Sequence, residues 1–479
     1  MPTAPLFFRP IHTSYLLMNQ PPATFDTLFH TGVRLMNDGD AAGAEHAFRA
    51  AIAVDPDISA AHINLGLLLA QRAAWVDAEQ HYRIALALAP DQLHGYLHYG
   101  VMLAAQHRFE QAEQAYRHAL AIDPTAPAVL SNLGVLLACT ARETEAEACY
   151  RAALAAEPDY RNASFNLAYL LLRQGRYDEG WAAFEAREWY ARLARHFDFP
   201  RWHGEPLAGK TLIIGFEAGH GDMIQFCRYA AQVKAQGAAH VAIVCHPGLK
   251  RLFTRVQGVD AVFGFDDDVP RTGYDFWTPP LSFPLIFGTR VDTIPAALPY
   301  LHADPAKVVT LAPLTRTAER TLRVGLAWQG NPRFENDSER SLASLDVLAP
   351  LGDVPGVRFF SLQKGAGGLR VDQPPPFALT DLAPHIDNFD DTAALITQLD
   401  LVIAVDTAVA HLAGALGKPV WVLLPAFKTD WRWLTERTDS PWYPHVMRLF
   451  RQHAAGDWLD VVAALTAALH EMAASHAAS

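Results

Sequence analysis

Cysteine is scarce in this 479-residue chain, which contains only four. Cys139, Cys149, Cys227 and Cys245 match neither a metal-ligand spacing nor a disulfide framework. Their pattern argues against a small disulfide-rich fold and against a structural zinc site. We therefore expect a reducing compartment.

Long apolar runs are also missing. No apolar segment is long enough to cross a bilayer as a helix. The segment Met1–Gln20 has no basic stretch followed by a continuous apolar core, because Arg9, Pro10 and His12 interrupt it. We expect neither a membrane span nor a signal peptide, and therefore a cytoplasmic protein.

Runs of basic residues are absent as well. The chain has 39 Lys and Arg against 51 Asp and Glu, which gives a formal net charge of −12. No run of Lys and Arg exceeds two residues. These features argue against nucleic acid as a partner. The length allows about three domains of ordinary soluble composition.

Several catalytic signatures are not found. The sequence shows no Ser-His-Asp or Cys-His arrangement, and the dinucleotide-binding motif G-x-G-x-x-G is absent. One D-x-D motif, Asp266–Asp268, follows a predicted strand. We interpret it as a solvated loop rather than as a metal site.

The N-terminal third repeats every 34 residues, and four columns of residues share this period. They are Pro56, Pro90, Pro124 and Pro158; Gly32, Gly66, Gly100 and Gly134, with Ala168 in phase; Phe48, Tyr82, Tyr116, Tyr150 and Phe184; and Ala44, Ala78, Ala112 and Ala146, with Gly180 in phase. The glycines let helices approach closely, the aromatic rings fill the space between helices, and each proline ends a helix. The pattern resembles the tetratricopeptide repeat and predicts about five repeats over residues 24–192.

Such repeats must stack, because one helix pair cannot bury its own apolar face. The concave face of a stacked array usually binds peptide or protein. Asn64, Asn132, Asn162 and Asn166 lie on or near the first helices of the repeats. They either hydrogen-bond a bound peptide or are solvated polar positions.

From Gly209 onward, strands alternate with helices, which is typical of a doubly wound parallel sheet. The alternation restarts at Arg323 after a proline- and threonine-containing connection. We therefore predict two Rossmann-like halves, 205–320 and 321–479. The predicted helices include 223–236 in the first half and 345–351 in the second. Ligands of open α/β sheets bind at the carboxyl ends of the strands.

The segment Leu401–Gly417 predicts a buried strand, a tight turn and a helix. Asp406 and Thr407 are good N-cap residues, so the N-terminus of the helix would face the carboxyl end of the sheet. Its unpaired N–H groups and partial positive charge suit an anion such as a diphosphate. His411 lies one turn into the helix. Alternatively, Thr407 only caps the helix and His411 is a core histidine.

Other polar motifs also sit at predicted strand ends. They are Gly219, His220, Gly221 and Asp222 in the first half, and Gln329, Asn331, Gln363 and Lys364 in the second. Together with Asp406 and Thr407 they predict one site. The two glycines allow a close backbone approach or a positive φ angle. Asp222 is either an N-cap or a general base, with His220 as the rival base.

Cations and aromatic residues complete the candidate list. Arg340 and Lys364 are candidate countercharges for a diphosphate, or ordinary surface cations. Trp431 and Trp442 follow the last predicted core strand. Their rings either stack on a base or sugar or pack in the core.

These residues resemble a GT-B glycosyltransferase, and most closely glycosyltransferase family 9, the ADP-heptosyltransferase-like family. The resemblance rests on Gly221-Asp222 and on Asp406-Thr407-Ala408-Val409-Ala410-His411, and it extends over about residues 209–458. It implies a metal-independent, inverting transfer of a sugar from a nucleotide-sugar donor, without a cofactor. Asp222 would be the base. Asp406, Thr407, Ala408 and His411 would lie at the diphosphate and sugar.

One departure concerns the donor. Heptosyltransferases of the family typically carry a Lys-x-Trp-Pro element after the strand that matches Val324–Trp328, whereas this loop holds Arg333 and Arg340. The difference puts a heptose donor in doubt and leaves a hexosyl- or heptosyl-type transferase as the expectation. The domain order is similar to that of O-linked N-acetylglucosamine transferases, whose repeats present a protein acceptor.

The leading hypothesis is therefore a multidomain glycosyltransferase. Its fold is an all-α tetratricopeptide-repeat superhelix followed by an α/β GT-B fold. Its partners are a nucleotide-sugar donor and an acceptor, such as a protein or peptide, recruited by the repeats. One alternative is a non-catalytic repeat scaffold with a degenerate GT-B domain. Another is a GT-B-shaped sugar-nucleotide epimerase.

Overall fold

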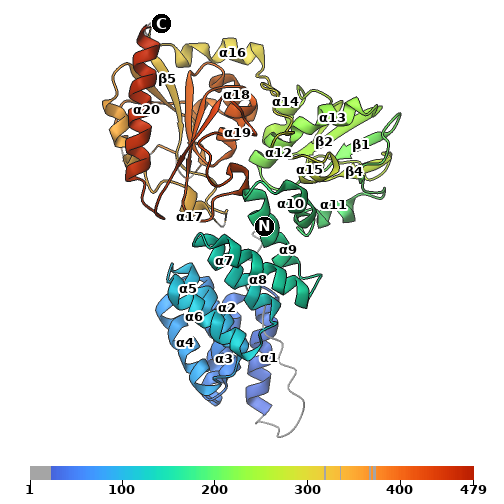
Figure 1. Cartoon of the computed structure of the whole chain (residues 1–479), viewed down its shortest axis with the longest axis vertical. Helices are drawn as coiled ribbons and strands as arrows, with labels where there is room; N and C mark the ends of the chain where they lie inside the picture. The colour runs from blue at the N-terminus through green and yellow to red at the C-terminus, as the bar shows by residue number, and fades with distance from the viewer. Residues whose placement is uncertain (1–22, 318–319, 335, 366–367, 370–373, 479) are drawn as a thin grey trace. The chain divides into compact units, whose positions relative to one another are not determined.

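The computed structural model describes residues 23–317, 320–334, 336–365, 368–369 and 374–478 (Figure 1). The chain divides into two compact units, Met1–Leu170 and Leu171–Ser479. The division falls inside the fifth predicted repeat. No helix among the described residues is long and apolar enough to cross a membrane.

The first unit consists of antiparallel helix pairs, as the 34-residue period predicts. Its helices are α1 (Ala23–Asn37), α2 (Ala41–Val54), α3 (Ser59–Gln71), α4 (Trp75–Leu88), α5 (Leu93–Ala105), α6 (Phe109–Ile122), α7 (Pro127–Cys139) and α8 (Glu143–Ala156), followed by α9 (Arg161–Arg173), which crosses the division. The second helix of the fifth repeat, α10 (Tyr177–Phe184), belongs to the second unit. The predicted repeat architecture is confirmed.

The repeating glycines lie directly under the repeating aromatic rings. A Cβ atom added at Gly134 would lie 2.5 Å from Cε1 of Tyr150, and one at Gly66 would lie 3.2 Å from the Tyr82 ring. Both rings are buried. The ring of the second helix of each pair therefore packs against the backbone of the first helix, which explains why the two columns share one period.

The repeat asparagines divide into different roles. Asn64 is fully buried in α3. Asn132 donates to the Ala128 carbonyl at 2.8 Å, and Asn166 donates to the Ser131 hydroxyl at 3.1 Å. The solvated role is therefore wrong for Asn64. Binding of a peptide by these residues stays a prediction.

The second unit contains two parallel sheets. The first has the order β3-β2-β1-β4 and consists of β1 (Thr211–Ile214), β2 (His240–Cys245), β3 (Ala261–Gly264) and β4 (Phe276–Thr278). Its helices are α12 (His220–Phe226), α13 (Ala230–Ala235), α14 (Lys250–Phe253) and α15 (Phe283–Ile286), and the short α11 (Ala191–His196) precedes the sheet. The predicted helix 223–236 is interrupted by a 3-10 turn at Cys227–Tyr229 and begins three residues earlier, at His220.

The second sheet has the order β10-β9-β8-β5-β6-β7. Its strands are β5 (Leu322–Ala327), β6 (Val357–Ser361), β7 (Leu379–Asp381), β8 (Leu401–Val405), β9 (Val420–Leu424) and β10 (Met447–Arg451), all parallel. The helices of this half are α16 (Pro305–Leu311), α17 (Asp337–Arg340), α18 (Phe389–Ile396), α19 (Ala408–Ala415) and α20 (Leu459–Ala478). Figure 1 shows α20 on one side of this sheet and α18 and α19 on the other.

The central strands of the second sheet are fully buried, so their side chains are apolar on both faces. The predicted helix 345–351 is a 3-10 helix, Leu345–Asp353, that contains Pro350. Proline removes a backbone donor and disfavours the α-helix at this point. Two parallel α/β halves are thus present, and their strand ends carry the candidate site.

The glycine–ring contact yields a stability prediction. We expect Gly134→Ala to lower the free energy of unfolding by about 1–2 kcal/mol, because the new methyl group overlaps the Tyr150 ring. Gly66→Ala is the matched control, because its looser contact lets the gain in helix propensity, about 0.5–1 kcal/mol, offset the overlap. Urea unfolding of the full chain, followed by circular dichroism, checks both. Equal effects of the two substitutions would contradict the packing.

Candidate functional site

The N-terminus of α19 begins directly after the buried strand β8. The Thr407 hydroxyl accepts the backbone N–H of Val409 at 3.1 Å, so Thr407 is the N-cap that the sequence predicts. Asp406, Thr407 and Ala408 are half-buried, whereas the helix after Val409 is buried. In this half-buried first turn the Ala408 N–H has no acceptor within the helix, so it can donate to an anion.

Asp406 and His411 lie together at this helix. Asp406 accepts the Trp433 indole N–H at 2.9 Å, and its other oxygen lies 3.9 Å from Nε2 of His411. The opposite ring nitrogen of His411 lies 2.9 Å from the Tyr443 hydroxyl. His411 is only 5% exposed and stacks on Trp433, with ring centroids 5.3 Å apart.

Burial determines the charges of these two residues. It lowers the pKa of His411 well below the ordinary value, and the charges of Arg432, Arg228 and Arg340 lower it further. His411 is therefore neutral. Burial also raises the pKa of Asp406 to about 6, and the nearby Asp430 carboxylate adds to this shift.

The first half touches this region through α12. A Cβ atom added at Gly221 would lie 2.8 Å from the His411 ring and 3.6 Å from the Ala408 Cα atom. The glycine thus permits the close approach that its position predicts. The positive φ angle belongs instead to Ala218, at 58°, so that expectation is wrong for Gly219 and Gly221.

Asp222 lies in the first turn of α12 and contacts both halves. Its Oδ2 accepts the Gly219 N–H at 2.8 Å, which satisfies one donor at the helix start. Its Oδ1 accepts a hydrogen bond from Arg432 of the second half. Asp222 therefore caps the helix and also contacts the second half through Arg432, so capping does not exclude the predicted role as a base.

Arg432 is a site residue that the sequence interpretation missed. It lies in a 3-10 helix, Trp431–Trp433, and its guanidinium also donates to both Asp430 oxygens at 2.9 Å. The only signal in the sequence is its place in the segment Asp430-Trp431-Arg432-Trp433-Leu434, in which the tryptophans are the more conspicuous ligand candidates.

His220 stacks on His246, with ring centroids 3.8 Å apart. Burial, followed by the charge of His246, lowers the pKa of His220 to about 4. Burial also lowers the pKa of His246, against the hydrogen bond to the Ala218 carbonyl and the charge of Asp222. Both imidazoles are neutral at pH 7, so His220 is a weaker base than its ordinary pKa suggests.

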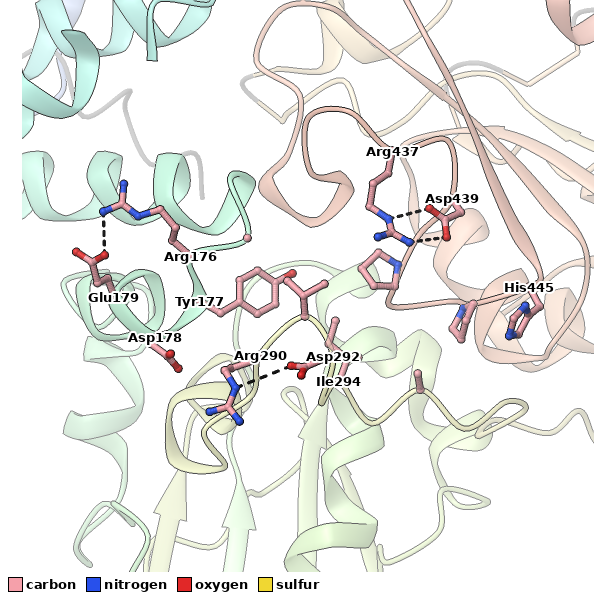
Figure 2. A pocket seen from close by; sticks show the side chains of 15 residues that line it. Arg176, Tyr177, Asp178, Glu179, Arg290, Asp292, Ile294, Arg437, Asp439 and His445 are labelled. Atoms are coloured by element: carbon pink, nitrogen blue, oxygen red, sulfur yellow. Dashed lines mark hydrogen bonds and ion pairs between the residues drawn. The ribbon is translucent and has the colours of Figure 1, made fainter. Parts of the chain in front are cut away.

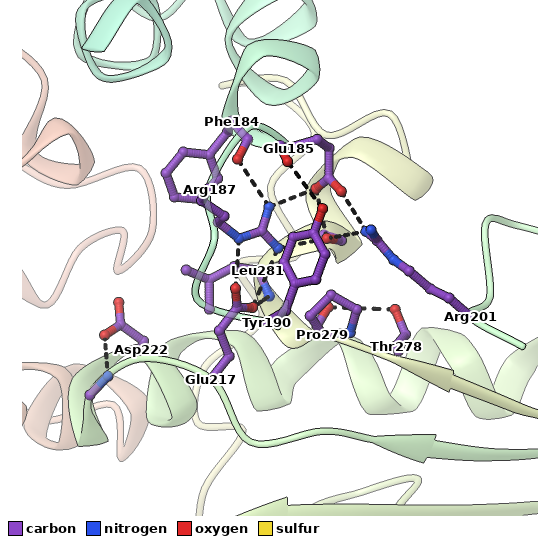
Figure 3. Close-up of polar contacts among 12 residues, drawn as sticks. Phe184, Glu185, Arg187, Tyr190, Arg201, Glu217, Asp222, Thr278, Pro279 and Leu281 are labelled. Carbon is purple, nitrogen blue, oxygen red and sulfur yellow. Dashed lines mark hydrogen bonds and ion pairs between the residues drawn. The ribbon is translucent and has the colours of Figure 1, made fainter. Parts of the chain in front are cut away.

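A buried ion-pair network lies just before the Asp222 turn (Figure 3). The Arg187 guanidinium donates to Glu217 at 2.7 Å, and both side chains are fully buried. It also donates to Glu185 at 2.7 Å and to Ser282 at 2.6 Å. Because removing one member would leave a buried charge uncompensated, the network fixes the segment that leads into the turn.

The side-chain amides of Gln363 and Gln329, which follow predicted strands, form hydrogen bonds with the protein backbone. Gln363 accepts the N–H groups of Trp328 and Gln329 at 3.0 Å, and its own amide donates to the Gln329 and Lys364 carbonyls. Gln329 donates to the Leu342 carbonyl at 3.0 Å. Gln363 is 3% exposed. Gln363 therefore joins the ends of β5 and β6, and its placement among donor ligands is corrected. Gln329 joins the end of β5 to Leu342, and its role toward a donor stays a prediction.

The remaining polar residues of the second half differ in position. The exposed Lys364 donates to the Ala383 carbonyl at 2.9 Å. Asn331 is exposed and accepts the Arg333 N–H at 3.1 Å. Arg340 pairs with Asp337 at 3.2 Å, and its charge acts on Asp406 and His411. Arg340 is thus the predicted countercharge that the structure brings toward α19.

Trp431 and Trp442 are 1% and 0% exposed. Their ring centroids lie 6.1 Å apart, and both rings pack edge-on against Trp181. This burial leaves neither ring open to a ligand. Their predicted role in stacking on a base or sugar is wrong, because both rings fill the core.

A pocket of about 800 Å³ is lined by residues other than the predicted site residues (Figure 2). Its charged lining residues pair within their own segments, with Arg176 on Glu179 at 2.8 Å, Arg437 on Asp439 at 2.6 Å and Arg290 3.9 Å from Asp292. With Asp178, the lining holds four carboxylates against three arginines, so the pocket does not resemble an anion site.

The raised pKa of Asp406 yields a pH-dependent prediction. The folded state holds this proton more tightly than the unfolded chain, so stability falls as the pH rises from about 4 through about 6. Asp406→Asn removes the buried charge and keeps an acceptor for Trp433. We expect a gain on the order of 2 kcal/mol at pH 8 and no gain at pH 4.

Urea unfolding followed by tryptophan fluorescence measures this gain. The second unit holds every tryptophan except Trp75. A loss of stability at pH 8 would show that Asp406 is held by its partners as a stabilising carboxylate.

Comparisons with known proteins agree with both parts of the chain. The tetratricopeptide-repeat model matches residues 31–92, 77–127 and 144–196, and the glycosyltransferase family 9 (heptosyltransferase) model matches residues 366–424. The second match includes β8, the Asp406–His411 segment and β9, but not Asp222.

Relatives are found for larger parts of the chain. Protein FlbA of Caulobacter vibrioides is 28% identical over 325 residues, which cover 62% of this chain and 53% of FlbA. The chain thus matches about half the length of this relative. Among solved structures, pilF of Pseudomonas aeruginosa is 23% identical, covers 34% of this chain and 75% of its own, and has a TM-score of 0.32. A thermophilic repeat protein of Thermus thermophilus is 24% identical, covers 36% of this chain and 90% of its own, and also has a TM-score of 0.32. The chain thus combines tetratricopeptide repeats with a C-terminal α/β region similar to glycosyltransferase family 9.

Proposed function

We propose that the protein transfers a sugar from a nucleotide-sugar donor to a hydroxyl group of an acceptor that the repeats recruit. One observation carries this proposal. The capped N-terminus of α19 in one half lies against the Asp222 turn of the other half, through the Gly221–His411 contact. An anion site and a carboxylate thus share one location.

The diphosphate of the donor binds at the first turn of α19. Its N–H groups and partial positive charge favour negative charge, and Arg340 adds a full positive charge nearby. His411 is neutral and fixed by Tyr443, so it contributes hydrogen bonding rather than charge. Stabilisation of the departing diphosphate is the main catalytic contribution, commonly about 2.7–4 kcal/mol per well-placed donor.

Asp222 is the proton acceptor in this scheme. The acceptor hydroxyl oxygen forms a bond to the anomeric carbon while the bond from that carbon to the diphosphate oxygen breaks. The hydroxyl proton passes to the Asp222 carboxylate, and the bonding electrons leave with the diphosphate. Attack opposite the leaving group inverts the anomeric centre. The scheme requires neither a metal nor a cofactor.

A non-catalytic scaffold is the second candidate. The observation that favours it is that both oxygens of Asp222 already accept hydrogen bonds, from Gly219 and Arg432. A scaffold would bind its partners equally well after Asp222→Asn, and it would turn over no donor. Donor turnover by the purified protein therefore separates the two functions.

A thermal-shift screen of nucleoside diphosphates and nucleotide sugars tests the donor site. A ligand at 100 times its Kd stabilises the folded state by about 2.7 kcal/mol. With the donor identified, Asp222→Asn should lower turnover by about 100- to 10,000-fold while donor binding stays nearly unchanged. Asp268→Asn, in an exposed loop of the same half, is the control and should keep full activity. A screen without any stabilising nucleotide would reject the proposed function.

A further inference from the structure

Arg432 is a charged residue that is nearly removed from solvent, with 7% of its surface exposed. Its guanidinium donates in three directions. Nη1 contacts both oxygens of Asp430 at 2.9 Å, Nε contacts the Gln225 amide oxygen at 2.5 Å, and Nη2 contacts Asp222. A buried charge held by so many acceptors has a specific geometry rather than a loose ion pair.

These contacts cross between the two α/β halves. Asp430 belongs to the same segment as Arg432 and fixes the guanidinium within the second half. Asp222 and Gln225 belong to α12 of the first half and lie three residues apart, on one face of that helix. The guanidinium therefore contacts the same face of α12 that carries the proposed base.

The same guanidinium also acts on the diphosphate side. Its charge influences Asp406 and His411 at the start of α19. One side chain thus connects the carboxylate of the first half with the anion site of the second half.

We propose that Arg432 is the positioning residue of Asp222, which it orients toward the acceptor hydroxyl when the two halves are docked. The proposal rests on the proposed function. Oδ2 is held by the Gly219 N–H and Oδ1 by Arg432, so the carboxylate plane is fixed. Each oxygen keeps a second lone pair that can accept the proton of the acceptor.

Arginine suits this role for a geometric reason. A planar guanidinium presents five donors in a fixed fork and can serve Asp430, Gln225 and Asp222 at the same time. A lysine ammonium has three donors on a flexible stem and cannot reproduce this arrangement. Arg432→Lys therefore keeps the positive charge but no longer fixes the orientation of the Asp222 carboxylate.

The test is a double-mutant cycle of Arg432→Lys and Asp222→Asn in the full chain. We expect Arg432→Lys to lower kcat by about 100-fold, as for a catalytic group displaced by about 1 Å, with the donor KM changed less than about threefold. In the Asp222→Asn background, Arg432→Lys should have no further effect on kcat, because its contribution passes through Asp222. Additive losses, or a rise in KM alone, would overturn the proposal.

Arg437→Lys is the matched control. Arg437 follows in the same region of the chain and also pairs with an aspartate through two hydrogen bonds, to Asp439. Within the described part of the chain, no hydrogen bond or ion pair joins its side chain to α12. Its substitution should leave kcat within about twofold of the parent, since exposed ion pairs contribute little. If Arg437→Lys lowered kcat as much as Arg432→Lys, any substitution in this part of the chain would have the same effect, and Arg432 would not be the positioning residue of Asp222.

A second readout does not depend on turnover. The parent protein, the two single variants and the double variant are unfolded in urea. If the Asp222–Arg432 contact exists, the two single-variant losses in the free energy of unfolding should add up to more than the loss of the double variant. Coupled stability with no turnover of any donor by the parent protein would reject the proposed function, and the positioning role with it. Turnover by the parent without coupling in kcat would reject only the positioning role.

Discussion

The contact between Asp222 and Arg432 is the interaction on which the site depends. It joins a helix start of one parallel sheet to a 3-10 helix that follows a strand of the other. Other contacts join the same two halves, such as the hydrogen bond from Arg228 to the Trp442 carbonyl at 2.8 Å. The close approach of Gly221 to His411 supports the same junction sterically, because any larger side chain would meet the imidazole ring.

Burial then sets the chemistry of the junction. Both histidines of the site are neutral, since burial lowers their pKa. Three carboxylates, Asp222, Asp406 and Asp430, lie around Arg432, and burial raises the pKa of Asp406 to about 6, so this carboxylate becomes protonated below that pH. In the proposed function, the helix N-terminus and the arginines supply the positive charge that offsets these carboxylates when a diphosphate binds.

The sequence predicted the periodic parts of the structure well. A strict 34-residue period identifies helix pairs, and buried strands followed by cap residues locate Thr407 and Asp222, because these signals are local. Contacts between distant segments were not predictable in the same way. The sequence does not show that Trp181 packs against Trp431 and Trp442 and so keeps their rings from a ligand. Nor does it show that Arg432 contacts Asp222, which lies 210 positions earlier. Gln363 was misassigned because a strand-end amide can serve either a ligand or the backbone.

The most direct test is a crystal structure of the full chain with the nucleoside diphosphate that stabilises it most. The account predicts the β-phosphate at hydrogen-bonding distance, about 2.7–3.2 Å, from the backbone N–H of Ala408, the first residue of α19, with Asp222 and Arg432 facing the same space. A diphosphate bound instead in the pocket between Arg290 and Arg437, with an empty α19 N-terminus, would contradict it.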